Sequence, residues 1–275
     1  MSFVSAGDGV RLHVASTGEG APIVFIHEFG GTGHSFDLQI AALKDAYRCV
    51  AFNARGYPPS EVPSQVEAYS QDLAAADVVA VLDGLKIDRA HLVGVSMGAA
   101  AALQVAIRHP DRVRSVVLAS IGTGSDAKPE ELQAQMEGMA KLIETQGLAN
   151  LALSMGNQPA RRKLREKAPQ EFDKFIAELK ALSTVGMANT MRGVQKRRAP
   201  IYAHEAAIKV LQVPVMVVLG GDDAGCQKPS EFLARTISGA RLEIFPGTGH
   251  LVNIEEAERF NALLRDFVAW VESRG

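Results

Sequence analysis

The sequence predicts an α/β protein with a mostly parallel central sheet, helices on both faces of the sheet and an inserted helical cap. Three observations support this prediction. Short apolar runs alternate with segments of helical period in both the first and the last part of the chain. A Gly-x-Ser-x-Gly motif at residues 94–98 separates one apolar run from a helix rich in small residues. Between the two parts, residues 121–205 contain no apolar strand-like run.

The pattern of apolar residues predicts each element in turn. Residues 10–16 alternate between apolar and polar after a Gly-Asp-Gly turn, which indicates an antiparallel hairpin at one edge of the sheet. Continuous apolar runs predict buried parallel strands at residues 23–26, 49–52, 92–95, 113–119, 213–219 and 242–245. Apolar residues at helical spacing predict helices at 69–85, 99–107 and 255–271.

The middle of the chain breaks this alternation. It contains only helical periods separated by Gly and Pro, with amphipathic segments at 130–144 and 171–182. We therefore expect a single domain spanning 1–275, with a core formed by residues 1–120 and 206–275. The remaining residues, about 121–205, would be a helical cap inserted into that core.

Composition limits the classes of function. With 275 residues and 47% hydrophobic residues, the chain can bury a substantial core within one domain. A formal net charge of −2 argues against nucleic acid or an acidic membrane as the main partner. The N-terminal residues lack the basic and apolar segments of a signal peptide, and no run is long enough to span a bilayer. We expect a soluble cytoplasmic protein with a small-molecule substrate, and the sequence leaves a homo-oligomer open.

The predicted cap is more basic than the rest of the chain. It carries 13 Lys and Arg against 10 Asp and Glu, and its surplus comes from two clusters, Arg161-Arg162-Lys163 with Arg165 and Lys196-Arg197-Arg198. Such clusters are usually a solvated helix face. The alternative is a basic rim that attracts an anionic substrate.

Ser96, in the centre of the Gly-x-Ser-x-Gly motif, is the candidate nucleophile. A strand, a sharp turn and a helix are the context that a nucleophile elbow requires. The tight reversal at Ser96 leaves no room for a Cβ at Gly94 or Gly98. The N-terminus of the following helix would favour negative charge beside the serine hydroxyl.

A serine nucleophile needs a base, and the base needs a carboxylate to orient it. His250 follows Gly-Thr-Gly just beyond the last predicted strand, and it is the candidate base. Asp222 and Asp223 follow the preceding strand, so both lie where open α/β sheets build their sites. Only one of the two can point at the imidazole. We favour Asp223 as the acid and leave Asp222 as a residue that caps the loop.

The negative oxygen of a tetrahedral intermediate needs hydrogen-bond donors. One should be the backbone N–H of Met97, directly after the nucleophile. The second should come from the glycine-rich loop at residues 27–33, where we expect the N–H of Phe29.

Other reactive side chains receive structural roles. Cys49 and Cys226 are too few for a disulfide framework; we expect free thiols, with Cys226 packed in a loop. We expect structural roles for His13, His91 and His109. For His204 and His34, contact with the substrate stays open. Methionines of the cap would suit an adaptable apolar pocket wall or the ordinary core: Met155, Met187 and Met191.

Taken together, these motifs resemble the α/β-hydrolase superfamily over nearly the whole chain except the cap. The oxyanion loop of that family usually contains His-Gly-x-x-Gly, and here Glu28 replaces its first glycine. The segment 53–60 is similar to the family's Asp-x-Arg-Gly-x-Gly-x-Ser loop, with Asn53 in place of Asp. The resemblance also implies that the acid lies three residues after the strand-ending Gly220, at Asp223. The closing Gly-x-Gly-His signature is intact at residues 247–250.

The leading hypothesis is a cofactor-independent serine hydrolase of small carboxylic esters or lactones. Two alternatives use the same triad: hydrolysis of a carbon–carbon bond in a vinylogous diketone, and perhydrolase or haloperoxidase chemistry. Carbon–carbon hydrolases usually have an aromatic residue after the base, where this chain has Leu251. A serine at position 96 argues against epoxide or haloalkane hydrolysis. An alternative of a different class is a non-catalytic receptor for a small ligand. No nucleotide-binding or metal-binding motif is present, so we expect neither cofactor nor metal.

Overall fold

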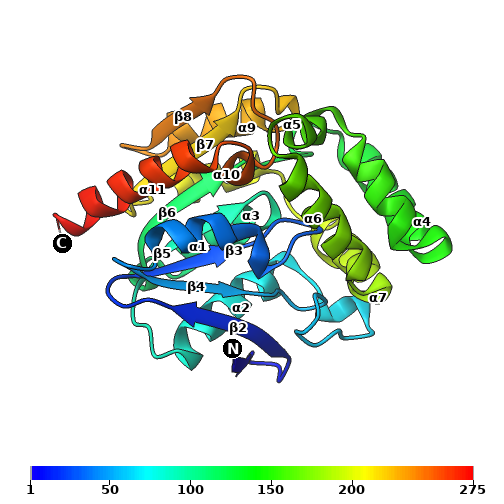
Figure 1. Ribbon diagram of the computed structural model, residues 1–275, viewed down its shortest axis with the longest axis horizontal. Helices are drawn as coiled ribbons and strands as arrows, with labels where there is room; N and C mark the ends of the chain where they lie inside the picture. The colour runs from blue at the N-terminus through cyan, green and yellow to red at the C-terminus, as the bar shows by residue number, and fades with distance from the viewer. Residues whose placement is uncertain (1, 275) are drawn as a thin grey trace.

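The computed structural model describes residues 2–274, which form one eight-stranded sheet with the strand order β1-β2-β4-β3-β5-β6-β7-β8. Figure 1 shows this order from the blue N-terminal strands to the orange β8. The hairpin of β1 and β2 pairs antiparallel with the sheet, and all the later pairings are parallel. The strands are β1 (Ser2–Ser5), β2 (Arg11–Thr17), β3 (Pro22–Ile26), β4 (Arg48–Phe52), β5 (Ala90–Val95), β6 (Val113–Ala119), β7 (Val215–Gly220) and β8 (Arg241–Phe245).

Helices connect these strands and fill the long insertion after β6. In the core, the α-helices are α1 (Asp37–Leu43), α2 (Gln71–Gly84), α3 (Met97–Arg108), α8 (Glu205–Lys209), α9 (Ala224–Thr236), α10 (Val252–Glu255) and α11 (Ala257–Glu272). In the insertion they are α4 (Pro129–Gly156), α5 (Pro159–Lys167), α6 (Pro169–Ala181) and α7 (Thr184–Thr190), followed by a π-helical turn, η4 (Met191–Gln195). Short 3-10 turns complete the chain: η1 (Gly33–Phe36), η2 (Val66–Ala68), η3 (Pro110–Arg112) and η5 (Ile201–His204).

Each buried strand supplies side chains to both faces of the sheet. On β3, Ile23 and Phe25 pack with α1 and α11, whereas Val24 and Ile26 pack with α2 and α3. This alternation follows from the two-residue period of a strand. Because both faces are covered, the central strands are apolar along their whole length. The fold class predicted from the sequence is confirmed.

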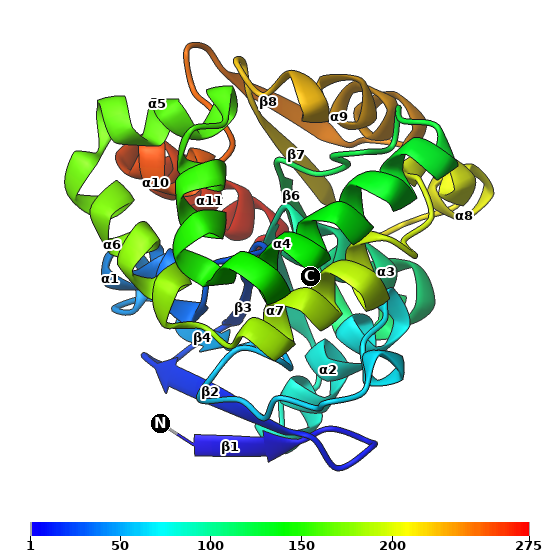
Figure 2. The ribbon, with the colours of Figure 1, turned by 90° about the vertical axis from the view of Figure 1, so that its right-hand side faces the viewer.

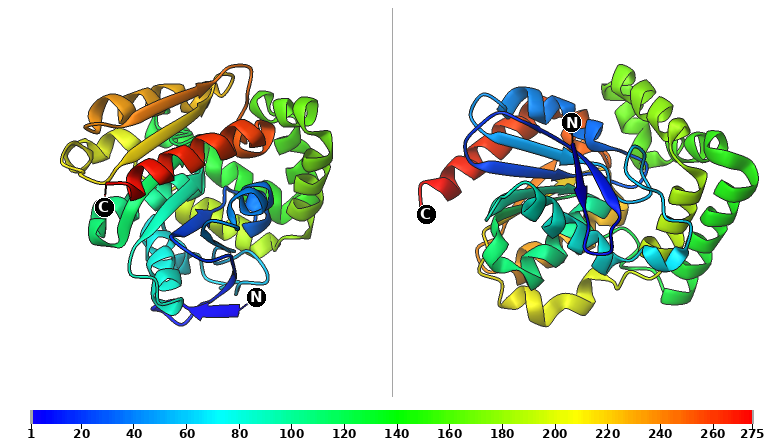
Figure 3. Two further views of the ribbon diagram at one scale, coloured as in Figure 1. Left: turned by 60° about the vertical axis from the view of Figure 1, so that its left-hand side comes forward. Right: turned by 90° about the horizontal axis from the view of Figure 1, so that it is seen from below.

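The cap helices lie at the end of the sheet where the parallel strands finish. Figure 2 shows α4 and α7 in front of the strands, and Figure 3 shows the cap projecting from one end of the molecule, opposite the C-terminus. Apolar cap residues such as Leu151 and Phe175 join the same buried cluster as Phe25 and Phe29 of the core. At the end of the insertion, Ile201 already packs against the core on the α9 side of the sheet.

The first cap helix is longer than the sequence indicated. We expected an amphipathic helix at 130–144, whereas α4 runs from Pro129 to Gly156. Inside it Gly147 has φ 78° and ψ 176°, which is not helical, so two helical segments meet there. Glycine tolerates this positive φ because it has no Cβ. Across residues 2–274, no helix combines the length and the apolar character needed to cross a bilayer.

Candidate active site

Ser96 lies on a strained turn between β5 and α3. Its backbone has φ 53° and ψ −109°, and its amide donates to the carbonyl of Ala119 at 2.8 Å. A Cβ on Gly98 would lie 2.0 Å from the carbonyl oxygen of Ile26, and one on Gly94 would lie 2.4 Å from that of Gly98. Both glycines are therefore required by close backbone approach. A positive φ at a serine is uncommon and typical of a functional turn.

His250 and Asp223 form a buried pair at the ends of β8 and β7. The Nδ1 atom of His250 lies 2.6 Å from Oδ2 of Asp223. Because a carboxylate only accepts hydrogen bonds, Nδ1 donates and Nε2 is the nitrogen left for a second partner. Burial would raise the pKa of the Asp223 carboxyl, but the charge and hydrogen bond of His250, together with Cys226 and the charge of Arg161, outweigh it and lower that pKa. The pair has the geometry that orients a general base.

The neighbouring carboxylate of Asp222 points away from this pair. Its side chain is 42% exposed and lies 3.3 Å from Nζ of Lys163 in the cap. Its backbone amide donates to the carbonyl of Thr248 at 2.9 Å. Asp222 therefore joins the cap to the loops of the core, while Asp223 faces the imidazole.

Ser96, Asp223 and His250 line one cavity of about 250 Å³ between the cap and the sheet. In the described chain, no hydrogen bond joins the Ser96 hydroxyl to the imidazole of His250, although both side chains line this cavity. Its walls combine apolar side chains with a few polar ones, which are in chain order Phe29, Thr123, Leu132, Gln135, Met136, Met139, Leu151, Met155, Gln158, Arg161, Met191, Gln195 and Arg198.

The backbone amides of Phe29 and Met97 are the two donors that the sequence predicts for the oxyanion. Among residues 2–274, neither the amide of Phe29 nor that of Met97 donates a hydrogen bond to another group of the protein. Met97 begins α3, where the first amides of a helix have no partner within it. Phe29 precedes Gly30, whose φ of 87° turns the loop. Both donors are therefore available to a ligand oxygen.

His27 holds the oxyanion loop in place, a role that sequence reasoning missed. Its Nδ1 lies 2.8 Å from the carbonyl oxygen of Glu28, and its Nε2 accepts from the amide of Ala54 at 3.0 Å. Burial lowers the pKa of His27 to about 4. The imidazole is thus neutral at pH 7, and Nδ1 is the donor. A histidine at the end of a buried strand was the available signal.

Glu28, which departs from the family pattern, fits without backbone strain. Among the described residues, the non-glycine residues with positive φ are Lys86, Ser96 and Ser120, and Glu28 is not one of them. Its carboxyl is fully buried, and Oε1 accepts from the hydroxyl of Ser35 at 3.1 Å. Burial raises the pKa of this carboxyl. The carboxyl packs closely against Gly31, where a Cβ would lie 2.3 Å from Oε1 of Glu28.

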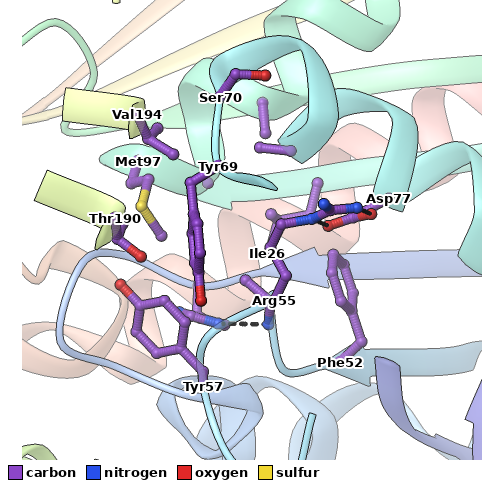
Figure 4. Close-up of a pocket in the computed structure, with 15 residues that line it drawn as sticks. Ile26, Phe52, Arg55, Tyr57, Tyr69, Ser70, Asp77, Met97, Thr190 and Val194 are labelled. Carbon is purple, nitrogen blue, oxygen red and sulfur yellow. Dashed lines mark hydrogen bonds and ion pairs between the residues drawn. The ribbon is translucent and has the colours of Figure 1, made fainter. Parts of the chain in front are cut away.

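The loop at residues 53–60 is fixed by Asn53, which stands where the family usually has Asp, and by a buried ion pair. Asn53 accepts from the amide of Gly33 at 2.9 Å and donates to the carbonyl of Pro58 at 2.7 Å. The guanidinium of Arg55 binds both carboxylate oxygens of Asp77, at 2.8 and 2.7 Å. Figure 4 shows this pair beside a small cavity that Met97 also lines. The neutral Asn53 thus connects the loop at residues 27–33 to the loop at residues 53–60.

Glu255 fixes the loop that carries the base. Its carboxylate accepts from the amides of Gly249, at 2.6 Å, and Leu251, at 3.0 Å. A carboxylate in the first turn of a helix that reaches back to preceding amides is a capping arrangement. Burial raises the pKa of Glu255, which the two amides oppose. Sequence reasoning missed this residue, although a glutamate in the first turn after a histidine loop was a readable signal.

The cap helix α5 is fastened to the same loop. The amide of His250 donates to the carbonyl of Ala160 at 3.0 Å, and Nζ of Lys167 lies 2.9 Å from Oγ1 of Thr248. A Cβ on Gly249 would lie 1.8 Å from the carbonyl oxygen of Ala160. His250 is therefore held by the cap as well as by the core.

The remaining candidates take structural positions. His204 pairs with Gln104 at 3.1 Å, and His34 lines a different cavity, near Asp37. Met155 and Met191 line the cavity of Ser96, whereas Met187 is buried in the core.

Cys226 lies in α9 beside the acid–base pair. Its Sγ is 4.0 Å from Nδ1 of His250 and 3.2 Å from the carbonyl oxygen of Ser120. Asp223, Cys226 and His250 offer metal-ligand atoms within 4.8 Å of one another. However, Asp223 and His250 use these atoms on each other, and burial raises the pKa of the thiol. The three residues are therefore arranged as a hydrogen-bonded group with a protonated thiol.

Comparisons with known proteins agree with this architecture. The model of the family described as alpha/beta hydrolase fold matches residues 21–257. A 2-hydroxymuconate semialdehyde hydrolase from Pseudomonas sp. (strain CF600) is 31% identical over 95% of this chain and 91% of its own. The 3-oxoadipate enol-lactonase 1 from Acinetobacter baylyi is 29% identical over 98% of this chain and 97% of its own. The crystal structure of a hydrolase from Pseudomonas aeruginosa PA01 matches with a TM-score of 0.86 at 26% identity, covering 97% of both chains.

The chain belongs to the α/β-hydrolase family, as its motifs predicted. It is an enzyme of this family, since its relatives are hydrolases, esterases and enol-lactonases. The alternative of a non-catalytic receptor is thereby disfavoured.

Proposed function

We propose that this protein hydrolyses small carboxylic esters or lactones through an acyl-enzyme at Ser96. The observation that carries the proposal is the 2.6 Å contact between His250 and Asp223 in a cavity that Ser96 also lines. Three side chains far apart in the sequence there meet at one cavity. No metal-binding or cofactor-binding motif is needed for this chemistry.

In the first half of the reaction, Oγ of Ser96 attacks the carbonyl carbon and its proton passes to Nε2 of His250. Asp223 stabilises the imidazolium that forms. The negative oxygen of the tetrahedral intermediate accepts from the amides of Phe29 and Met97, beside the N-terminus of α3. The proton on His250 then goes to the leaving alcohol oxygen, and the carbon–oxygen bond of the ester breaks.

In the second half, water attacks the acyl carbon and gives its proton to His250. The second tetrahedral intermediate collapses, the proton returns to Oγ of Ser96, and the carboxylic acid is released. With a lactone substrate, the leaving hydroxyl remains attached to the acyl group and the product is a single hydroxy or oxo acid. The similarity to an enol-lactonase supports lactones as substrates.

Ser96→Ala tests the proposal. The variant should lose at least about 10⁴-fold in kcat for a p-nitrophenyl ester, because only a small residual activity remains when a triad member is removed. Circular dichroism should show an unchanged fold. Undiminished turnover by a folded Ser96→Ala protein would reject Ser96 as nucleophile.

Carbon–carbon bond hydrolysis is the second candidate, favoured by one specific similarity. The substrate named for the Pseudomonas relative, 2-hydroxymuconate semialdehyde, has no ester bond, so hydrolysis there must cleave between carbons. A panel that contains esters, lactones and a vinylogous diketone separates the candidates by kcat/KM. The ester and lactone proposal fails if only the diketone is turned over.

A further inference from the structure

Arg161 of α5 is a buried arginine whose side chain has no hydrogen-bond or ion-pair partner among residues 2–274. It is only 6% exposed, and it lines the cavity that contains Ser96 and His250. Among residues 2–274, its side chain forms no hydrogen bond and no ion pair, and Nη1 is buried and unsatisfied. Its guanidinium lies 5.0 Å from the centre of the Phe175 ring, which supports it from one side.

A buried guanidinium needs an anion. Arginine stays charged at every working pH, and leaving a buried charge unpaired is costly. Burial lowers the pKa of Arg161, although the charges of three carboxylates oppose this. Those carboxylates belong to Glu28, Asp223 and Glu255, and none of them reaches ion-pair distance.

Asp223 and Glu255 are already bound elsewhere, and Glu28 is bound through one oxygen only. Asp223 binds His250, and Glu255 accepts from the amides of the base loop. Glu28 accepts from the Ser35 hydroxyl through Oε1, whereas its Oε2 is buried and has no hydrogen-bond partner among residues 2–274. The protein thus supplies no hydrogen-bonded counter-anion for Arg161, and the open side of the guanidinium is the cavity.

We propose that Arg161 binds a carboxylate of the substrate, so that the enzyme acts on esters or lactones that carry a second, free carboxylate group. This inference rests on the proposed function, because it concerns the same cavity. The flat fork of a guanidinium matches a carboxylate with two parallel hydrogen bonds. The wall also contains the amide groups of Gln158 and Gln195 and the guanidinium of Arg198, which already donates to the carbonyl oxygen of Thr123.

The position of Arg161 is fixed relative to the base. The residue before it, Ala160, accepts from the amide of His250 at 3.0 Å. Arg161 therefore keeps a set distance from the reacting groups, which is how a binding residue orients a substrate. The other basic residues near it have other contacts: Lys163 binds Asp222, Arg165 lies over the ring of Phe172, and Arg198 donates to the carbonyl oxygen of Thr123.

The test compares two esters of equal chain length in three proteins. The mono-p-nitrophenyl ester of glutaric acid carries the free carboxylate, and p-nitrophenyl pentanoate has a methyl group in its place. The wild type should prefer the glutarate ester. Arg161→Met should lower kcat/KM for it by about 10- to 100-fold, the usual effect of losing a charged hydrogen bond. The same variant should change kcat/KM for the pentanoate by less than about 3-fold.

Arg162→Met is the matched control, because Arg162 is the exposed neighbour on the same helix. It should leave both esters unchanged. Equal losses on the two esters in Arg161→Met would make Arg161 a structural residue and overturn the proposal. A wild type that does not prefer the anionic ester would also overturn it. If the wild type turns over neither ester, the proposed function itself is refuted.

Ligand binding to Ser96→Ala provides a readout that does not depend on the Arg161 variant folding. Glutarate should raise the melting temperature of Ser96→Ala more than inorganic phosphate does at the same concentration. Stabilisation by phosphate alone, or no shift with either anion, contradicts the carboxylate assignment.

Discussion

Arg55 and Arg161 are both buried, but they are satisfied in opposite ways. Arg55, in the core, binds both oxygens of Asp77 and is joined by Asp8 and by the carbonyl of Ala68. Figure 4 shows its guanidinium against the carboxylate of Asp77. Arg161, in the cap, has no partner among the described residues.

The difference separates structural charge from functional charge. A buried arginine that fixes a loop is paired within the protein, because an unpaired charge would destabilise the fold. An arginine that binds a ligand has unpaired N–H donors in the free protein, and the unpaired charge destabilises the fold. The acid–base pair of Asp223 and His250 combines the two cases, since it is paired internally on one side and open to the cavity through Nε2.

The two arginines should therefore differ in their effect on stability. Arg55→Met is expected to lower the free energy of unfolding by about 3–5 kcal/mol, because it leaves the buried carboxylate of Asp77 without its partner. Arg161→Met should change the free energy of unfolding by less than about 1 kcal/mol, or increase it, since no ion pair is lost. Urea unfolding measures both values. Equal destabilisation by the two substitutions would contradict the distinction.

A smaller effect is expected from His27, which is buried neutral rather than buried charged. Burial lowers its pKa to about 4, whereas the unfolded chain has the ordinary value of 6.5. Between pH 6.5 and 4 the unfolded chain therefore binds more protons, and stability falls as the pH falls. This single group accounts for about 3 kcal/mol over that window.

His91 is held neutral in the same way, with its pKa lowered to about 4 by burial. His27→Asn should thus remove roughly half of the joint pH dependence while lowering the baseline stability. Unfolding measured at several pH values between 4 and 7 gives the slope. A slope unchanged by the substitution would show that His27 does not titrate on unfolding.

Much of the fold was predictable because the strand and helix patterns are local. The apolar runs placed the parallel strands, and the small residues around Ser96 placed the elbow. The pair of adjacent carboxylates was harder. Which of Asp222 and Asp223 faces the base depends on the twist of one loop, and only the structure separates them by geometry.

The cap shows where sequence reasoning stops. The basic run from Arg161 to Arg165 gave two alternatives, a solvated face or a rim that attracts anions. The structure divides the run: Arg162 is exposed, while Arg161 is buried in the cavity. This difference depends on the rotation of α5 against the base loop, which is a long-range contact. The roles of Glu255 and His27 were missed for a different reason: their partners are backbone amides and carbonyls, which no residue type marks in the sequence.

Covalent labelling of Ser96 tests the central claim most directly. A fluorophosphonate probe followed by peptide mass spectrometry should modify Ser96 in the folded wild type. Labelling of Asp223→Asn should be about 10⁴-fold slower, because the base loses its orienting carboxylate, whereas the adjacent control Asp222→Asn should label at the wild-type rate. An unmodified Ser96 in folded wild-type protein, or equal labelling rates in the two aspartate variants, would contradict the account.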